Sequence, residues 1–145
     1  MRHTLQAWLK PRRVVHAHCD LPCGVYDPAQ AKIEAQSVKA VQERYNDPGK
    51  FKGAGESEEG YRARCLQIKE QRADMVKEHL WVLWTDYFKP EHEEAHPGLH
   101  DLFWRATKAA GAAKKSTDPA QGQQLLDLIT EIDDVFWATK GGRPA

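Results

Sequence analysis

Residues 118–140 read DPAQGQQLLDLITEIDDVFWATK, and this stretch predicts an amphipathic helix. Asp118 is a favourable N-cap residue, and Pro119 takes the first helical position, where its missing N–H costs nothing. The apolar residues that follow recur every three or four positions, as on one face of a helix; they are Leu125, Leu128, Ile129, Ile132 and Phe136. A helix with one apolar face must bury that face against other elements, so the stretch predicts a packed helical fold.

Three other segments of the chain have the same character. The letters DPAQ recur at residues 27–30, where they predict the start of a helix from about Pro28 to Tyr45. We expect further helices from about Ser57 to Phe88, Pro97 to Lys115 and Pro119 to Lys140. The third helix carries an apolar stripe of Leu99, Leu102, Phe103, Ala106, Ala110 and Ala113. Because no window alternates like a strand, the sequence predicts an all-α, antiparallel four-helix bundle.

Two charged residues stand on stripes that are otherwise largely apolar. Glu34 lies on the stripe of the first helix, and Arg72 lies on that of the second. The stripes are Ala31, Glu34, Val38, Val41 and Tyr45, and Tyr61, Cys65, Ile68, Arg72, Met75 and His79. A lone buried charge is costly, so one interpretation is that Glu34 and Arg72 meet each other or a third polar group near the core. The other is that the stripes are slightly rotated and both charges are solvated.

Composition limits the classes of function. The chain has 145 residues, which is the size of one domain. Its 21 basic residues balance 21 acidic ones, so no global positive field indicates nucleic acid or an anionic membrane as a partner. No apolar run approaches the roughly 18 residues that a membrane helix needs. Three cysteines favour metal or redox chemistry over a disulfide framework, which indicates a reducing cytoplasm.

The first seventeen residues differ from the rest of the chain. They contain four of the basic residues and no acidic one, so the remaining chain carries four more acidic than basic residues. The basic residues at positions 10, 12 and 13 stand where a secretory signal would need its apolar region. The segment is therefore not predicted to be a secretory signal.

The chemistry of the chain is concentrated in HCDLPCGVY, residues 18–26, ahead of the first helix. Cys19 and Cys23, with a turn-forming Pro and Gly near them, can bring two sulfurs to one ion, and His18 adds an imidazole. If the chain is cut before His18, the new amine and the Cys19 amide nitrogen complete a square plane with the two thiolates. Such a plane suits nickel(II) or copper(II), whereas zinc prefers a tetrahedron. The spacing alone also fits a structural metal site, a redox pair or incidental thiols.

The run from His18 to Tyr26 resembles the nickel-binding hook of nickel-containing superoxide dismutases. Other stretches also resemble this family: KEQR at 69–72, WTDYFKP at 84–90, STDPA at 116–120 and FWATK at 136–140. The resemblance covers essentially His18 to Lys140. The segment 47–56 is not matched, which leaves subunit contacts in that region open.

The resemblance implies a cytoplasmic homohexamer of four-helix bundles that disproportionates superoxide. Each subunit is expected to hold one nickel ion, which alternates between the +2 and +3 states while superoxide is converted to oxygen and hydrogen peroxide. The implied metal ligands are His18 through its amine and imidazole, Cys19 through its amide nitrogen and thiolate, and Cys23 through its thiolate.

The resemblance also implies roles for residues around the metal. Glu34 and Arg72 match a pair that orients the axial imidazole, in line with the outer partners that usually hold a ligating histidine. Tyr26 and Tyr87 match tyrosines that exclude larger ligands and order water. The other candidate catalytic residues are Asp20, which would stabilise the hook, and Lys89, which would attract the superoxide anion.

An amine ligand at His18 exists only after the Ala17–His18 bond is cut. We therefore expect residues 1–17 to be a cleavable leader and residues 18–145 to be the four-helix-bundle domain. The resemblance implies a dedicated maturation protease, and the uncut precursor is expected to be inactive.

Two other functions remain open from the sequence. A non-catalytic nickel or copper storage protein would use the same hook, whereas a helical interaction module would not need the cysteines. Outside the hook, Cys65 is predicted to be a small core residue, and His92 and His96 are predicted to lie in a surface loop between two prolines. The tryptophans are expected in the core or at subunit interfaces.

Overall fold

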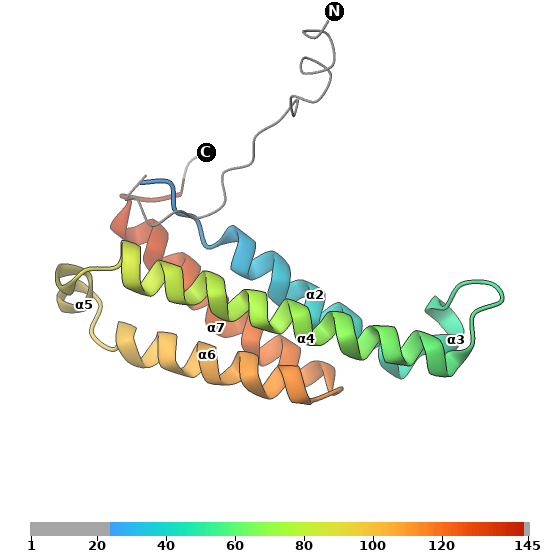
Figure 1. Ribbon diagram of the computed structural model, residues 1–145. Coiled ribbons are helices and arrows are strands. Elements are labelled where there is room, and N and C mark those ends of the chain that lie inside the picture. Colours follow the sequence, from blue (N-terminus) through green and yellow to red (C-terminus); the bar gives the residue numbers. More distant parts are fainter. Residues whose placement is uncertain (1–23, 144–145) are drawn as a thin grey trace, which may run out of the picture.

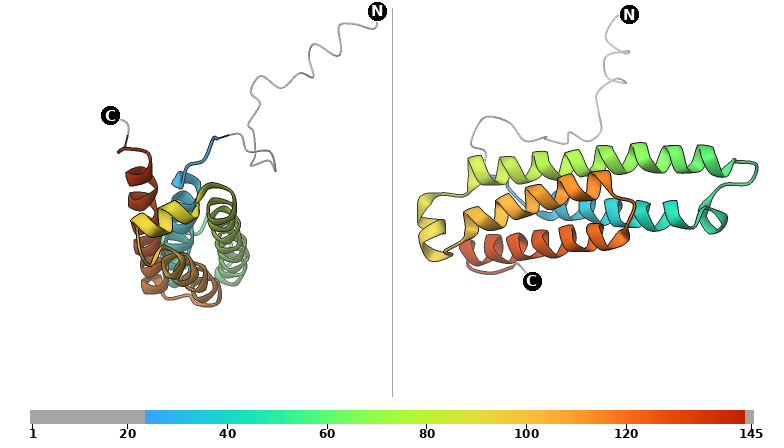
Figure 2. Two further views of the ribbon diagram at one scale, coloured as in Figure 1. Left: turned by 90° about the vertical axis from the view of Figure 1, so that its left-hand side faces the viewer. Right: turned by 90° about the horizontal axis from the view of Figure 1, so that it is seen from below.

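The computed structural model describes residues 24–143, most of which belong to four long helices. These are α2 (Ala29–Asn46), α4 (Glu58–Val82), α6 (Leu99–Lys115) and α7 (Pro119–Thr139), and successive long helices run in opposite directions (Figure 1). Helices α2 and α6 stand at opposite corners of the bundle, and each packs mainly against α4 and α7 (Figure 2). No strand occurs within residues 24–143. The predicted all-α, antiparallel four-helix bundle is confirmed.

The repeated DPAQ letters start two of these helices by the predicted capping chemistry. The Asp27 carboxylate accepts a hydrogen bond from the backbone N–H of Ala29 at 2.8 Å. The Asp118 carboxylate accepts the equivalent bond from Ala120 at 2.9 Å. Each bond satisfies one of the N–H groups that the first turn of a helix leaves without an internal partner.

The core confirms the stripes predicted for the third and fourth helices. Every residue of both stripes is buried, and Leu125, Ile129, Ile132 and Phe136 of α7 are fully buried. Burial of each large apolar side chain contributes roughly 1.5–3 kcal/mol to stability. This shared interior fixes the relative position of the four helices.

The buried face of α4 is rotated by one position from the predicted stripe. Ile68 is exposed, and Lys69 is buried in its place. The Lys69 ammonium donates to the backbone carbonyls of Ala113 and Lys114, at the end of α6, where a helix leaves carbonyls unpaired. Burial lowers the pKa of Lys69. The predicted stripe was wrong from this point on, because it was drawn mainly through apolar residues and a buried lysine does not fit such a pattern. Cys65 is buried as predicted.

Two short helices occupy connections between the predicted helices. They are α3 (Pro48–Phe51) and α5 (Pro90–Ala95), and each begins with a proline at the first helical position. The prediction that His92 lies in a loop is therefore wrong, because His92 belongs to α5. None of the described helices is long and apolar enough to cross a membrane.

Candidate functional site

The predicted site begins ahead of α2, and only part of it falls within residues 24–143. His18, Cys19, Asp20 and Cys23 lie outside the described residues. In the described part of the chain, no three His, Cys, Asp or Glu side chains form a group suited to a metal ion. The described residues therefore offer no such ligand set of their own.

Tyr26 and Tyr87 lie side by side at the end of the bundle where α2 begins. Their ring centroids are 5.7 Å apart, and the rings are tilted by 51°. Tyr26 follows Cys23 by three residues, whereas Tyr87 comes five residues after the C-terminal end of α4. The fold thus brings together two tyrosines that the sequence separates widely.

The hydroxyl group of Tyr87 has a defined orientation. Its oxygen lies 2.6 Å from Thr139 Oγ1, and Thr139 Oγ1 donates its own proton to the backbone carbonyl of Phe136 at 2.7 Å. Because a hydroxyl has one proton to donate, Tyr87 must be the donor to Thr139. The lone pairs of the Tyr87 oxygen are left to accept hydrogen bonds from other groups.

The backbone at Tyr87 departs from the α-helix. Residues Leu83–Tyr87 form the π-helix η1, which continues α4. It closes with a hydrogen bond from the N–H of Phe88 to the carbonyl of Leu83 at 3.0 Å. Such wider turns inside helices are rare and often accompany functional sites. Here the turn ends at Phe88, whose buried side chain meets the Tyr87 ring edge-on at 5.0 Å.

Glu34 is a buried carboxylate on α2, with only 1% of its surface exposed. Gln30 Nε2 donates to its Oε1 at 2.6 Å, and Arg72 Nη1 contacts both of its oxygens, at 2.9 Å and 3.2 Å. The pairing therefore agrees with the first interpretation of the two charged stripe residues. An ionised carboxylate has about four acceptor positions, so Glu34 can take a further donor.

Arg72 reaches this carboxylate from the edge of α4. Its side chain remains 42% exposed, and its Nη1 also lies 3.8 Å from Met75 Sδ. A long side chain of this kind packs its stem on apolar surface while its charge stays near water. Arg72 therefore still reaches Glu34, although the buried face of α4 differs from the predicted stripe and leaves Ile68 exposed.

A second buried carboxylate joins the start of α2 to the chain beyond α7. Asp133 accepts from Lys32 Nζ at 3.0 Å and from Arg143 Nη2 at 2.8 Å. Burial opposes ionisation of Asp133, but the hydrogen bonds from Arg143 and Lys32 prevail and lower its pKa. One carboxylate thus ties the first turn of α2 to the segment that follows α7.

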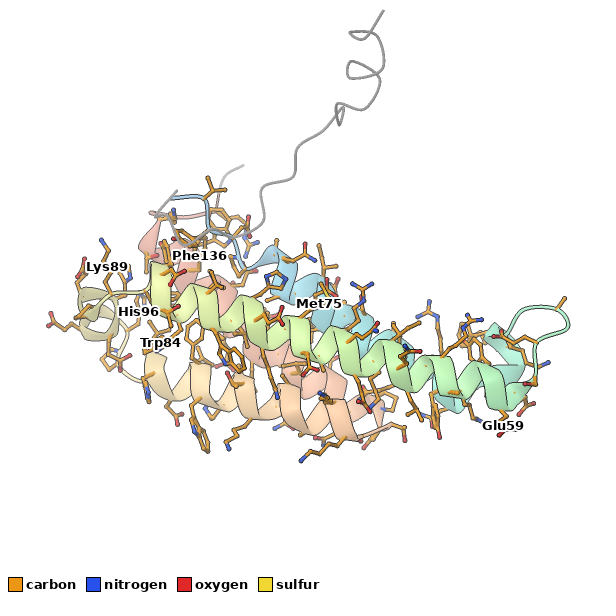
Figure 3. The ribbon with its side chains drawn as sticks, viewed as in Figure 1. Glu59, Met75, Trp84, Lys89, His96 and Phe136 are labelled. Atoms are coloured by element: carbon orange, nitrogen blue, oxygen red, sulfur yellow. The ribbon has the colours of Figure 1, made fainter. Side chains whose placement is uncertain are left out.

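Lys89 is the residue that the sequence proposed for attraction of an anion. Its side chain is 65% exposed, and its Nζ lies 4.0 Å from Glu91 Oε1. Figure 3 shows Lys89 and Phe136 at the same end of the bundle, with Met75 further along α4 and Glu59 at the opposite end. The positive charge of Lys89 is partly offset by its acidic neighbour.

Three residues near Tyr87 had no role in the sequence analysis. The His92 ring stacks on the Tyr87 ring, with centroids 5.6 Å apart. Thr139 accepts a hydrogen bond from the Tyr87 hydroxyl, and Lys140 Nζ lies 5.1 Å from the centroid of the Tyr87 ring. Helical spacing places Thr139 one turn after the buried Phe136, and Lys140 directly follows α7, but neither fact indicates that the two residues reach Tyr87. The position of His92 depends on α5, which was not predicted because the prolines on either side were taken to indicate a loop.

Comparison with known proteins points to one family. Residues 13–140 match the family model described as nickel-containing superoxide dismutase. The protein called superoxide dismutase [Ni] from Streptomyces seoulensis is 57% identical over 130 residues, which are 90% of this chain and 93% of that protein. The one from Streptomyces coelicolor is 56% identical, with the same coverage. A crystal structure of Ni-containing superoxide dismutase with its Ni-ligation in the oxidized state has a TM-score of 0.76 and 56% identity; the match covers 86% of this chain and all of that one.

Proposed function

Since the chain belongs to the nickel-containing superoxide dismutase family, and so disproportionates superoxide with a nickel cofactor, we propose which of its own residues build the site. When bound, nickel supplies the one-electron redox chemistry that superoxide disproportionation needs. We propose that His18, Cys19 and Cys23 hold the metal. This donor set of thiolates, nitrogen atoms and an imidazole fits nickel, and the absence of a competing ligand group within residues 24–143 supports it.

Glu34 and Arg72 are proposed to hold the imidazole of His18. Glu34 is buried, oriented by Gln30 and Arg72, and has an acceptor position to spare for a ring N–H. A ligating histidine is usually held in this way by an outer partner, which fixes its ring and raises its basicity. This spare acceptor on a fully buried carboxylate is the observation that carries the assignment of roles.

Tyr26 and Tyr87 are proposed to line the open side of the centre. Their packed rings leave little room for large ligands. The Tyr87 oxygen can accept a hydrogen bond from ordered water, because the Tyr87 hydroxyl donates its own hydrogen bond to Thr139. Asp20 is proposed to stabilise the hook, and Lys89 to attract superoxide.

Maturation and assembly complete the proposal. Residues 1–17 form a leader, and a protease cuts the Ala17–His18 bond to release the amine ligand. The active form is a homohexamer in the cytoplasm. Trp81 and Trp104, which are 52% and 56% exposed, supply apolar surface suited to contacts between subunits.

The test compares superoxide decay by two nickel-loaded proteins, one that begins at His18 and one that is uncut. Fast decay only in the cut form is the expected result. Equal activity in both forms would overturn the role of the amine. Tight nickel binding without superoxide decay in either form would instead favour metal storage.

A further inference from the structure

Lys140 directly follows α7 and lies on an aromatic surface next to the proposed site. Its backbone N–H donates to the carbonyl of Trp137 at 3.1 Å, which keeps the chain in a helical turn. Its Nζ lies 5.1 Å from the ring centroid of Tyr87 and 5.5 Å from that of Phe136. An ammonium within about 6 Å of a ring centroid is attracted by the electrons of the ring. The cation is thus held beside the tyrosine pair.

The charge of Lys140 is not offset by an acidic partner. Among the ion pairs of residues 24–143, Lys140 takes part in none, whereas Lys89 lies near Glu91 and Arg143 pairs with Asp133 and Asp134. The chain that begins at His18 carries four more acidic than basic residues, so its overall field repels an anion. An unpaired cation beside the site counteracts that field locally.

We infer that Lys140 attracts the superoxide anion to the Tyr26–Tyr87 pair. The inference rests on the proposed function, because it requires the reaction to occur beside these tyrosines. Superoxide is a small monoanion, and a charge within a Debye length of its path raises the rate of encounter. Lys140 also lies at the C-terminus of α7, where a cation stabilises helix carbonyls, so the test must separate attraction of the substrate from stability.

The test uses nickel-loaded protein that begins at His18 and three variants: K140Q, K140R and K108Q. Lys108 is the matched control because its Nζ lies 5.4 Å from the Trp104 ring, beside a pocket that contains neither tyrosine. At an ionic strength of about 0.01 M we expect K140Q to lower the second-order rate constant for superoxide by about threefold. The difference should vanish as salt screens the charge, and K140R and K108Q should behave like the parent.

Three results would overturn the inference. One is an unchanged rate in K140Q, and another is a loss that persists undiminished at high salt in both K140Q and K140R. The third is an equal loss in K108Q. Melting temperature and bound nickel are measured on each variant, and a fall in either one that accounts for the lost rate also counts against it. If the parent protein itself does not remove superoxide, the proposed function fails, which is a different outcome from an active parent with an unaffected variant.

A second readout does not depend on turnover. Nitrate serves as a stable monoanion and is titrated into metal-free protein whose tyrosines carry carbon-13 in the ring. We expect the Tyr87 signals to shift on addition of nitrate in the parent and in K140R, and to shift much less in K140Q. Equal shifts in all three proteins would show that Lys140 does not draw anions to this surface.

Discussion

Arg72 uses a single nitrogen, Nη1, to contact both carboxylate oxygens of Glu34, at 2.9 Å and 3.2 Å. One partner of this pair is buried and the other is half-exposed. The pair therefore holds a carboxylate in the interior of the bundle with a cation that reaches it from the surface.

Replacement of Arg72 by alanine should destabilise the protein more than loss of an exposed ion pair. The buried Glu34 carboxylate would lose its charged donor, and we expect the free energy of unfolding to fall by about 1–3 kcal/mol. The control is E58A, which breaks the exposed Arg62–Glu58 pair on the same helix and should cost less than about 1 kcal/mol. Urea unfolding of both variants at pH 7 measures the difference, and equal losses would contradict the prediction.

Replacement of Asp133 by asparagine should have an effect that depends on pH. Its pKa is lowered in the folded protein, so its ionised form stabilises the fold above the ordinary Asp pKa of about 3.9. That contribution is lost as the pH falls through the lowered folded pKa. We expect D133N to be about 1–3 kcal/mol less stable than the parent at pH 7, with the gap closing in acid. A gap of constant size in urea titrations from pH 7 to pH 3 would be inconsistent with this account.

Gly122 and Gly111 should respond in opposite directions to alanine. A Cβ at Gly122 would lie 2.4 Å from Gln42 Oε1 and 2.7 Å from the Cα of Lys39, so α2 and α7 would have to move apart. We expect G122A to lower the free energy of unfolding by about 1–3 kcal/mol. Gly111 also lies inside a helix, but its nearest new contact is the flexible end of Lys77 at 3.5 Å. G111A should stabilise the protein by about 0.5–1 kcal/mol, and thermal melting of both variants tests the contrast.

The hydrogen bond between Tyr87 and Thr139 should appear as a coupling energy. We expect Y87F and T139V to be non-additive in a double-mutant cycle of urea unfolding, with a coupling of about 0.5–1.5 kcal/mol. Superoxide removal should fall in T139V as well as in Y87F, because either change frees the ring that we propose to line the site. Strict additivity in the cycle would show that the bond contributes nothing.

The sequence predicted the helices well because their signals are local. Asp118 and Pro119 mark the start of α7, and its stripe ends in the core at Phe136, so a few neighbouring letters suffice. The helix over α4 was predicted, but part of its buried face was not, because Lys69 is buried by a tertiary contact with the last carbonyls of α6. The prediction failed on α5 because Pro90 was read as a break, although proline is well tolerated at the first helical position.

The site was predicted only as far as single residues could be interpreted. Glu34 was identifiable as a charge on an apolar stripe, and its contact with Arg72 is confirmed by the geometry. The roles of these residues at the metal remain predictions. The approach of Thr139 and Lys140 to Tyr87 could not be predicted, because it depends on how the end of α7 packs beside the π-helix.

The two ends of the bundle differ in what they can tolerate. The connection through α3 lies at the end remote from the start of α2 (Figure 1), and its Gly55 has a backbone φ of +79° on an exposed turn. A fluorescent peptide or an affinity handle inserted at Gly55 would therefore lie in the connection at the end of the bundle remote from the start of α2. Such an insertion also leaves the proposed cleavage site before His18 unmodified.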